Sequence, residues 1–181
     1  GFLKGKKIEF LKSATTRPIR DFVKENIFNI IEHTNLIKIK LKNSNILDLY
    51  SGVGSFGIEC ISRGAKKTIF IENDSKALLT LKKNIKDLKI NGQTEVFNTK
   101  IISFFSKLNH KDKFEIIFLD PPFAEKNFIE ELKIMKNSAI YKKNHLIIIH
   151  REKKSDDQCE KIINVILTKT YGRSKIIFGF F

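Results

Sequence analysis

The stretch Ile46-Leu47-Asp48-Leu49-Tyr50-Ser51-Gly52-Val53-Gly54-Ser55-Phe56-Gly57 decides the fold. An apolar run leads to an acidic residue and then to a Gly-x-Gly, and the residues from Phe56 onward have the pattern of a helix. This order predicts a strand, a tight turn and a helix. Glycine has no Cβ, and the first N–H groups of a helix lack partners, so such a turn can hold a nucleotide-like ligand against bare backbone.

The acid ahead of the turn bears on which ligand this is. Gly52, Gly54 and Gly57, with Glu72 about 20 residues further on, also fit a dinucleotide fingerprint. Asp48 would repel a pyrophosphate, whereas it suits the ammonium and sulfonium of S-adenosylmethionine. The alternatives are a dinucleotide site and a purely structural turn that Asp48 caps. We predict S-adenosylmethionine as the cofactor, bound by Asp48, Tyr50, Ser51, Gly52, Gly54, Glu72, Asn73 and Asn98.

The rest of the chain alternates strand and helix patterns, which predicts a mostly parallel sheet. We expect strands at 46–50, 67–72, 94–98, 115–120 and 145–150, and helices at 55–63, 75–89, near 101–108 and at 128–136. Two β-rich runs, 162–170 and 175–181, flank the hairpin signal Tyr171-Gly172-Arg173-Ser174. An open parallel sheet closed at one edge by an antiparallel hairpin is typical of S-adenosylmethionine-dependent methyltransferases.

Residues 1–45 form a basic arm and a helix that we expect to pack on a domain spanning 46–181. Residues 8–11 alternate in a way that predicts a short strand or hairpin. A helix is expected to start at Thr16-Arg17-Pro18. Its apolar stripe consists of Ile19, Val23, Ile27, Ile30 and Ile31.

The composition indicates a polyanionic partner. The formal net charge is +14, although part of this excess reflects a general richness in lysine. We predict that Lys4, Lys6, Lys7, Arg17 and Arg20 contact RNA phosphates. No apolar run approaches the roughly 20 residues that span a bilayer, and two isolated cysteines indicate neither a disulfide framework nor a zinc site. A cytoplasmic protein without a metal is expected.

The motif Asp120-Pro121-Pro122-Phe123 is the most specific signal and follows the apolar strand 116–119 directly. Proline lacks a backbone N–H, so the loop offers carbonyl and carboxylate acceptors with few competing donors. An exocyclic amine on a base is a poor nucleophile, and acceptors on its hydrogens stabilise the charge that develops during methyl transfer. Phe123 can stack on the base. The alternative is an ordinary Pro-Pro turn before a buried phenylalanine.

Three further polar residues lie at the ends of expected strands. Glu72 could accept both ribose hydroxyls, or it could be an ordinary strand-end acid. Lys100 is all donor and cannot accept from an adenine amino group, so we expect it to face solvent. His150 either touches the substrate or simply marks the end of its strand.

With these residues in hand, the chain resembles the RsmD family of bacterial 16S ribosomal RNA guanine-N2 methyltransferases over nearly its whole length. The similar segments are the Gly/basic opening 2–7, the Arg17-Pro18 helix with Asp21, Val23, Glu25, Phe28 and Asn29, the 48–57 loop, Glu72, and 120–123. The sequence departs from the family at Ile19, Arg20, Phe22, Lys100 and His150.

The resemblance implies a Rossmann-like class I methyltransferase with a seven-stranded sheet and a short basic N-terminal extension. It also implies methyl transfer to N2 of a guanine in 16S ribosomal RNA, free or within a partly assembled small subunit, by a monomer. The motif at 120–123 is shared with enzymes that methylate adenine, cytosine or glutamine amides. A DNA adenine-N6 methyltransferase therefore stays open as an alternative. The departures at Lys100 and His150 leave open a second alternative, an RNA-binding module that keeps the fold and has lost catalysis.

Overall fold

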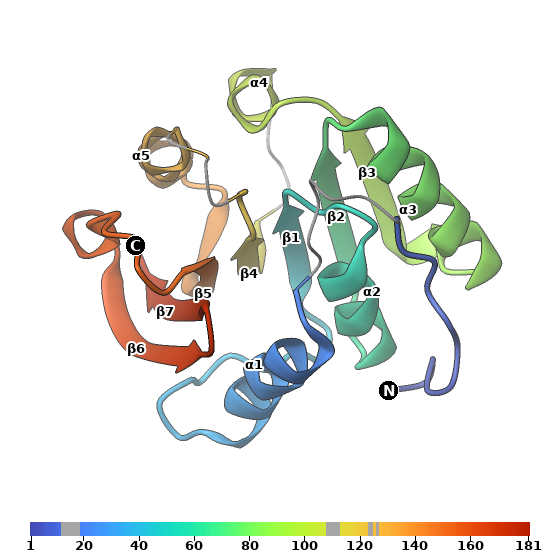
Figure 1. Cartoon of the computed structure of the whole chain (residues 1–181), viewed down its shortest axis with the longest axis horizontal. Coiled ribbons are helices and arrows are strands. Elements are labelled where there is room, and N and C mark those ends of the chain that lie inside the picture. The colour runs from blue at the N-terminus through green and yellow to red at the C-terminus, as the bar shows by residue number, and fades with distance from the viewer. Residues whose placement is uncertain (12–18, 108–112, 123–124, 126) are drawn as a thin grey trace.

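The computed structural model describes residues 1–11, 19–107, 113–122, 125 and 127–181. Its centre is one seven-stranded sheet with the strand order β3-β2-β1-β4-β5-β7-β6 (Figure 1). The strands are β1 (Asn45–Leu49), β2 (Lys67–Glu72), β3 (Thr94–Asn98), β4 (Phe114–Leu119), β5 (Tyr141–Glu152), β6 (Asn164–Tyr171) and β7 (Ser174–Phe180). The helices are α1 (Asp21–His33), α2 (Ser55–Ser62), α3 (Ser75–Asp87), α4 (Ile101–Lys107) and α5 (Phe128–Ser138), with short 3₁₀ turns η1 (Asn91–Gln93) and η2 (Cys159–Lys161).

The predicted mostly parallel sheet is confirmed. β1 pairs in parallel with β2 and β4, β2 with β3, and β4 with β5. β7 runs antiparallel between β5 and β6, so the C-terminal hairpin closes one edge. The main difference in extent is β5, which spans 141–152 instead of 145–150.

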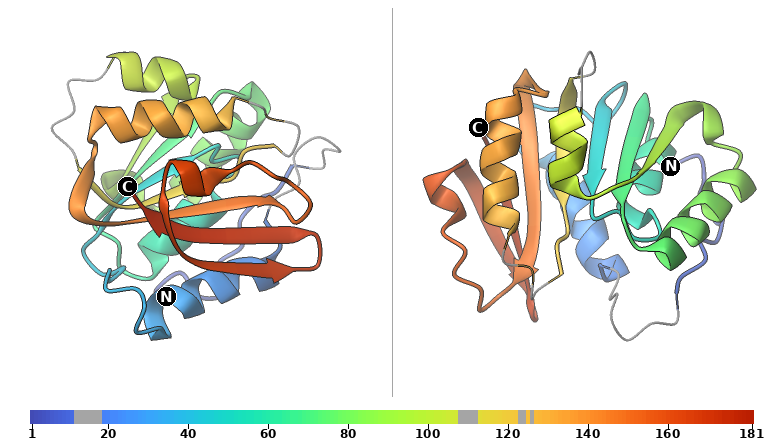
Figure 2. Two further views of the ribbon diagram at one scale, coloured as in Figure 1. Left: turned by 90° about the vertical axis from the view of Figure 1, so that its left-hand side faces the viewer. Right: turned by 90° about the horizontal axis from the view of Figure 1, so that it is seen from above.

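Helices cover both faces of the sheet in a three-layer arrangement (Figure 2). Alternate residues of each strand therefore belong to different cores: Ile46 packs with α1, α2 and α3, while Leu47 packs with α4 and α5. Phe56 lies at the centre of the first core. Its ring stacks between Phe28 and Phe118, with centroid distances of 5.2 and 3.9 Å.

α1 packs on this core through Val23, Ile27, Phe28 and Ile31. The expected helical stripe missed Phe28 and included Ile30, which is only half-buried. The expected start at Thr16-Arg17-Pro18 lies outside the described residues. Ile19 precedes the helix, and Arg20 is extended (φ −62°, ψ 140°).

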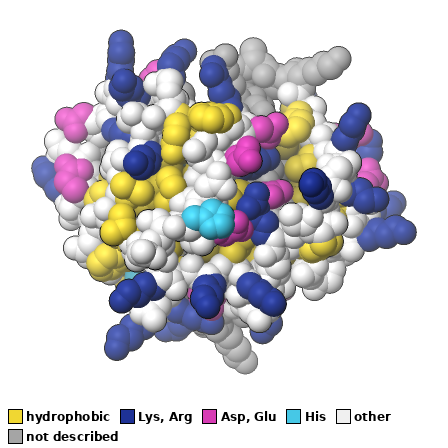
Figure 3. All heavy atoms as spheres, turned by 90° about the horizontal axis from the view of Figure 1, so that it is seen from below, with side chains coloured by type: hydrophobic (Ala, Val, Ile, Leu, Met, Phe, Trp, Pro, Cys, Tyr) yellow, Lys and Arg dark blue, Asp and Glu magenta, His cyan; other side chains and the backbone are white. Residues whose placement is uncertain are grey.

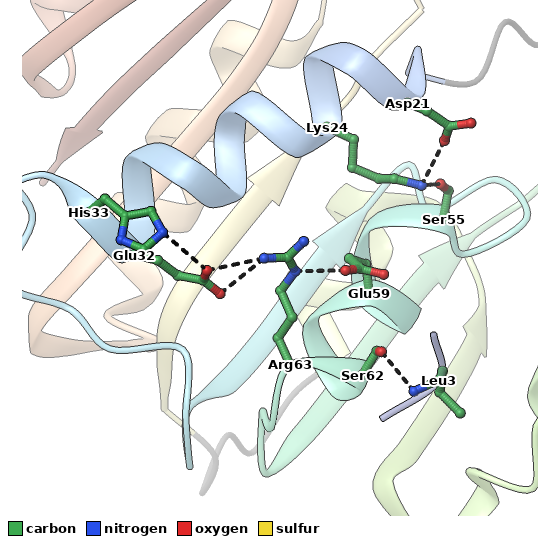
Figure 4. Close-up of polar contacts among 9 residues, drawn as sticks. All are labelled: Leu3, Asp21, Lys24, Glu32, His33, Ser55, Glu59, Ser62 and Arg63. Atoms are coloured by element: carbon green, nitrogen blue, oxygen red, sulfur yellow. Dashed lines mark hydrogen bonds and ion pairs between the residues drawn. The ribbon is translucent and has the colours of Figure 1, made fainter. Parts of the chain in front are cut away.

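Polar contacts also hold α1 to α2 (Figure 4). Lys24 Nζ lies 3.1 Å from Asp21 Oδ1 and donates to Ser55 Oγ at 2.8 Å. At the other end of the pair, Arg63 bridges Glu59 at 2.6 Å and Glu32 at 3.1 Å. Because Ser55 opens α2 directly after the glycine turn, the N-terminal helix is tied to the turn itself.

The N-terminal arm differs from the prediction of a strand at 8–11. Residues 8–11 pair with no strand. Instead, the backbone N–H of Glu9 donates to Asn84 Oδ1 at 2.9 Å, and Asn84 Nδ2 donates to the Glu9 carbonyl at 3.1 Å. A side chain of α3 thus supplies the partners that a neighbouring strand would have provided. Among the described residues, no helix is long and apolar enough to cross a bilayer.

We expect Gly54→Ala to lower the free energy of unfolding by about 2–6 kcal/mol. The backbone at Gly54 has φ +85°, and an added Cβ would lie 2.4 Å from Leu81 Cδ1, so strain and overpacking of about 1–3 kcal/mol each would combine. Urea unfolding measures the loss.

Gly172→Ala is the matched control. Its φ is also positive (+59°), but nothing lies within 4 Å of the added Cβ, so only the strain of about 1–3 kcal/mol applies. Equal losses in the two variants would mean that the contact with Leu81 contributes nothing.

Candidate active site

A cavity of about 490 Å³ opens at the carboxyl ends of the central strands. This is the edge at which open α/β sheets bind ligands, and the volume lies within the usual range for small-molecule sites. The wall combines the turn after β1, the ends of β2, β4 and β5, and the N-terminal segment. Its lining residues are Phe10, Leu11, Ile19, Asp48, Tyr50, Ser51, Gly52, Val53, Ser55, Phe56, Glu72, Asn73, Asp74, Ala77, Phe118, Asp120, Pro121, Pro122, His150 and Arg173.

The turn after β1 adopts left-handed backbone at Tyr50 (φ 59°), Gly52 (φ 55°) and Gly54 (φ 85°). A Cβ on Gly52 would meet nothing within 4 Å, so the turn presents open backbone to the cavity at this point. Tyr50 has a side chain in the left-handed region, which is costly for a bulky residue. Its hydroxyl donates to Glu131 of α5, and this contact holds the strained turn in place.

Glu72 joins this turn to the one after β2. Its Oε2 accepts the N–H of Gly52 at 2.7 Å, and its Oε1 accepts the N–H groups of Asn73 at 2.8 Å and Asp74 at 2.7 Å. A carboxylate has about four lone-pair sites, so one acceptor position is left for a ligand. Glu72 therefore shapes the cavity and can still bind.

Asp48 lies at the floor of the cavity and is 1% exposed. Its Oδ2 accepts the N–H of Gly57 at 2.9 Å, so this carboxylate caps α2 as well as facing the cavity. Burial raises the pKa of Asp48 well above its ordinary value, and the charges of Asp120 and Glu72 raise it further. A cationic ligand at this point would oppose that shift.

Asp120 is held by a buried histidine that the sequence left without a definite role. His150 Nδ1 lies 2.7 Å from Asp120 Oδ1, and His150 Nε2 lies 2.9 Å from Ser174 Oγ. A carboxylate only accepts, so Nδ1–H donates to Asp120, while Nε2 lies within hydrogen-bond distance of the Ser174 hydroxyl. This pairing uses Oδ1; within the described part of the chain no donor is bonded to Oδ2 of Asp120, so Oδ2 can face a ligand.

Arg151 fixes the loop that follows Asp120. Its guanidinium donates to the Pro122 carbonyl at 3.0 Å and reaches the Pro121 carbonyl at 3.5 Å, while Asp157 holds it from the other side at 2.9 Å. Arg151 therefore occupies one lone pair of each proline carbonyl, and both prolines still line the cavity. The predicted role of these carbonyls as ligand acceptors stays a prediction, beside the carboxylate of Asp120.

The structure places most of the predicted site residues around the one cavity. Gly54 and Asn98 do not line it: Gly54 caps α2, and Asn98 is exposed at the end of β3. Lys100 is also exposed and outside the lining. Phe123 and Arg17 lie outside the described residues. Lys4, Lys6, Lys7 and Arg20 are all exposed, as phosphate contacts require.

The family model described as "Conserved hypothetical protein 95" matches residues 1–179. The chain belongs to this family, the RsmD family.

The relatives of this RsmD-family chain include ribosomal RNA small subunit methyltransferase D of Buchnera aphidicola subsp. Acyrthosiphon pisum, 36% identical over 85% of this chain and 76% of the relative. The protein of the same name from Haemophilus influenzae is 34% identical over 84% and 77%. Among solved structures, the one described as "Putative methyltransferase yhhF from Escherichia coli" superimposes with a TM-score of 0.80 at 25% identity, covering 99% of this chain and 94% of that one. The predicted class I methyltransferase fold is confirmed.

Sequence reasoning missed three parts of this RsmD-family site. Ser174 lies in a turn signal, and Arg151 follows a strand-end histidine, so neither carries a motif of its own. Phe10, Leu11 and Ile19 line the cavity from the N-terminal segment, where apolar spacing indicated only secondary structure. Among the described residues, no cluster of His, Cys, Asp or Glu is placed to hold a metal ion.

We expect Asp48→Asn to remove a pH dependence of stability from this chain. In the native state Asp48 keeps its proton at pH values above about 4, the pKa of an aspartate in the unfolded chain. The free energy of unfolding therefore falls as the pH rises from about 4 towards the raised pKa of Asp48 in the native state. The slope is at most about 1.4 kcal/mol per pH unit. Asparagine keeps an oxygen for Gly57 and carries no charge, so urea unfolding between pH 4 and 8 should give a flatter profile for the variant. Parallel profiles would contradict the assignment.

Proposed function

We propose that this protein transfers a methyl group from S-adenosylmethionine to the exocyclic N2 of a guanine in 16S ribosomal RNA. Membership of the RsmD family supports methylation of ribosomal RNA, because the relatives are named small subunit methyltransferases. The observation that carries the choice of an amine is Asp120, whose Oδ1 is held by His150 and whose Oδ2 is left for the acceptor base.

The cavity fits S-adenosylmethionine as the cofactor. Asp48, Glu72 and Asp120 bring three carboxylates to one small site, which suits a ligand with two positive centres and disfavours one with phosphates. Glu72 has one acceptor position for a ribose hydroxyl, and the open backbone at Gly52 accepts close approach. When bound, the cofactor supplies an electrophilic methyl group.

The acceptor side is built by this chain's own residues. Asp120 Oδ2 accepts a hydrogen bond from the guanine amine and stabilises the positive charge that develops on it. The same oxygen can then take the proton that the amine loses. His150 and Ser174 fix the carboxylate, and Arg151 fixes the loop, so little reorganisation is needed during transfer.

The two departures that suggested an inactive module do not damage the site. His150 donates to Asp120, and Lys100 lies outside the cavity lining. Both positions are therefore compatible with an active enzyme. Methyl transfer from labelled S-adenosylmethionine to 16S ribosomal RNA, followed by nucleoside analysis, tests the proposal. N2-methylguanosine is expected, and methyladenosine or no product would contradict it.

We expect Asp120→Ala to slow single-turnover methyl transfer about 30- to 1,000-fold, which corresponds to about 2–4 kcal/mol for one preorganised polar contact. Asp120→Asn should lose less. An imidazole can accept at Nδ1 and donate at Nε2, so His150 can accept from the amide NH₂ and the amide oxygen then faces the amine. The affinities for RNA and cofactor should change little, and wild-type rates in Asp120→Ala would remove the residue from the mechanism.

The basic arm is the proposed phosphate contact. Positive charge is not confined to it, because Lys and Arg side chains surround the outline of the face shown in Figure 3. A test of the basic arm must therefore separate the effect of where its lysines lie from the effect of the total net charge. Lys4, Lys6 and Lys7 are exposed, and the backbone of Phe2 and Leu3 is bonded to Ser62 at the end of α2.

We expect the triple change of Lys4, Lys6 and Lys7 to Ala to reduce the slope of log affinity for RNA against log salt by about 2–3 units, because each lost phosphate contact contributes about 0.7–0.9. The control changes Lys38, Lys40 and Lys42 to Ala. These lysines are also exposed, and they lie outside the basic arm, in the segment before β1. Equal effects of the two triple changes would mean that only total charge matters.

A further inference from the structure

An aromatic pair, one ring exposed and the other half-buried, lies at the surface between α1 and the C-terminal hairpin. Phe22, in the first turn of α1, is 65% exposed. Its ring meets that of Tyr171, the last residue of β6, at a centroid distance of 5.8 Å and an interplanar angle of 87°. α1 and the β6–β7 hairpin lie side by side in both Figure 1 and Figure 2. We call this the Phe22–Tyr171 pair.

The pair lies beside the mouth of the cavity. On the α1 side, Ile19 lines the cavity three residues before Phe22. On the hairpin side, Arg173 lines the cavity two residues after Tyr171, and Ser174 bonds His150. The chain therefore runs directly from the aromatic pair to the residues that hold Asp120.

The charged residues near the pair include two arginines, and the acids Asp21 and Glu152 beside them are paired with Lys24 and Arg173. Arg20 is exposed next to the start of α1, and the Arg173 side chain is 70% exposed although it pairs with Glu152. Aromatic rings next to guanidinium groups are the combination on which unstacked bases of single-stranded RNA bind, with the rings stacking on bases and the charges meeting phosphates. Binding of a purely apolar partner would gain nothing from the two arginines at the edge of this surface.

Methylation of a guanine amine creates a need for such a surface. The target base must leave its stack to enter the cavity, and its neighbour in the strand then loses a stacking partner. We propose that the Phe22–Tyr171 pair binds the unstacked base adjacent to the target guanine, with the Phe22 ring as the stacking face. This inference rests on the RNA substrate proposed above and adds a determinant of RNA affinity outside the catalytic residues.

The chain contains no tryptophan, so Phe22→Trp introduces a single fluorophore at the proposed contact. Titration with a single-stranded RNA that carries the target guanine should quench its emission and shift it on saturation. Phe180→Trp is the matched control. Phe180 is 41% exposed and is the last residue of β7, at the end of the strand away from the turn that joins β6 to β7. Quenching confined to Phe22→Trp supports the inference, and equal or absent quenching at Phe22 overturns it.

Activity assays separate stacking from simple packing. Phe22→Leu keeps an apolar contact with Tyr171 and removes the ring, so we expect KM for RNA to rise about 5- to 100-fold, the range for one lost base–aromatic stack. The kcat at saturating RNA and the affinity for S-adenosylmethionine should be unchanged, and Phe22→Trp should restore the wild-type KM. A wild-type KM in Phe22→Leu would overturn the inference.

The two proposals fail in different ways. If wild-type protein methylates no guanine in ribosomal RNA, the proposed function fails, while the fluorescence titration still reports whether Phe22 meets a base. If wild-type protein is active and Phe22→Leu matches it in KM, only the stacking role fails. Thermal unfolding of Phe22→Leu should match wild type because the ring is largely exposed.

Discussion

Three carboxylates share one end of the sheet, and the donors that hold them are the constraint on which the site depends. Asp48, Glu72 and Asp120 are brought together by the parallel pairing of β1 with β2 and β4. Each has donors of its own: the N–H of Gly57, three backbone N–H groups of adjacent turns, and His150. The turns that end the strands therefore also supply the electrostatic stabilisation of the site, so folding and preorganisation cannot be separated.

The convergence of these carboxylates could be predicted from the sequence because parallel strands bring their carboxyl ends to the same edge. The contact of His150 with Ser174 could not. It depends on β7 pairing with β5 in the register His150↔Ile176, which places residue 174 diagonally across from the histidine. The register between two strands far apart in sequence is set by long-range packing and cannot be predicted from a short segment. The motif around Asp120, by contrast, can be recognised within a few residues. Arg151 was missed for the same reason.

The N-terminal segment shows a different limit of pattern reading. Phe10 and Leu11 are consecutive and both line the cavity, and Glu9 bonds Asn84 of α3, so residues 8–11 do not present alternate faces as a strand would. A pattern of apolar and polar residues does not name the partner that satisfies the backbone. Here one asparagine side chain does so in place of a strand. A segment that looked like a separate strand is thus part of the cavity wall.

The position of β7 has a consequence for synthesis on the ribosome. β6 precedes β7 in the chain, yet it reaches the sheet only through β7, which pairs directly with β5. Chains emerge at about 5–20 residues per second, and domains generally fold as units. His150 gains Ser174 only when β7 has emerged, so a nascent chain cannot align Asp120 until β7 has been synthesised and has paired with β5.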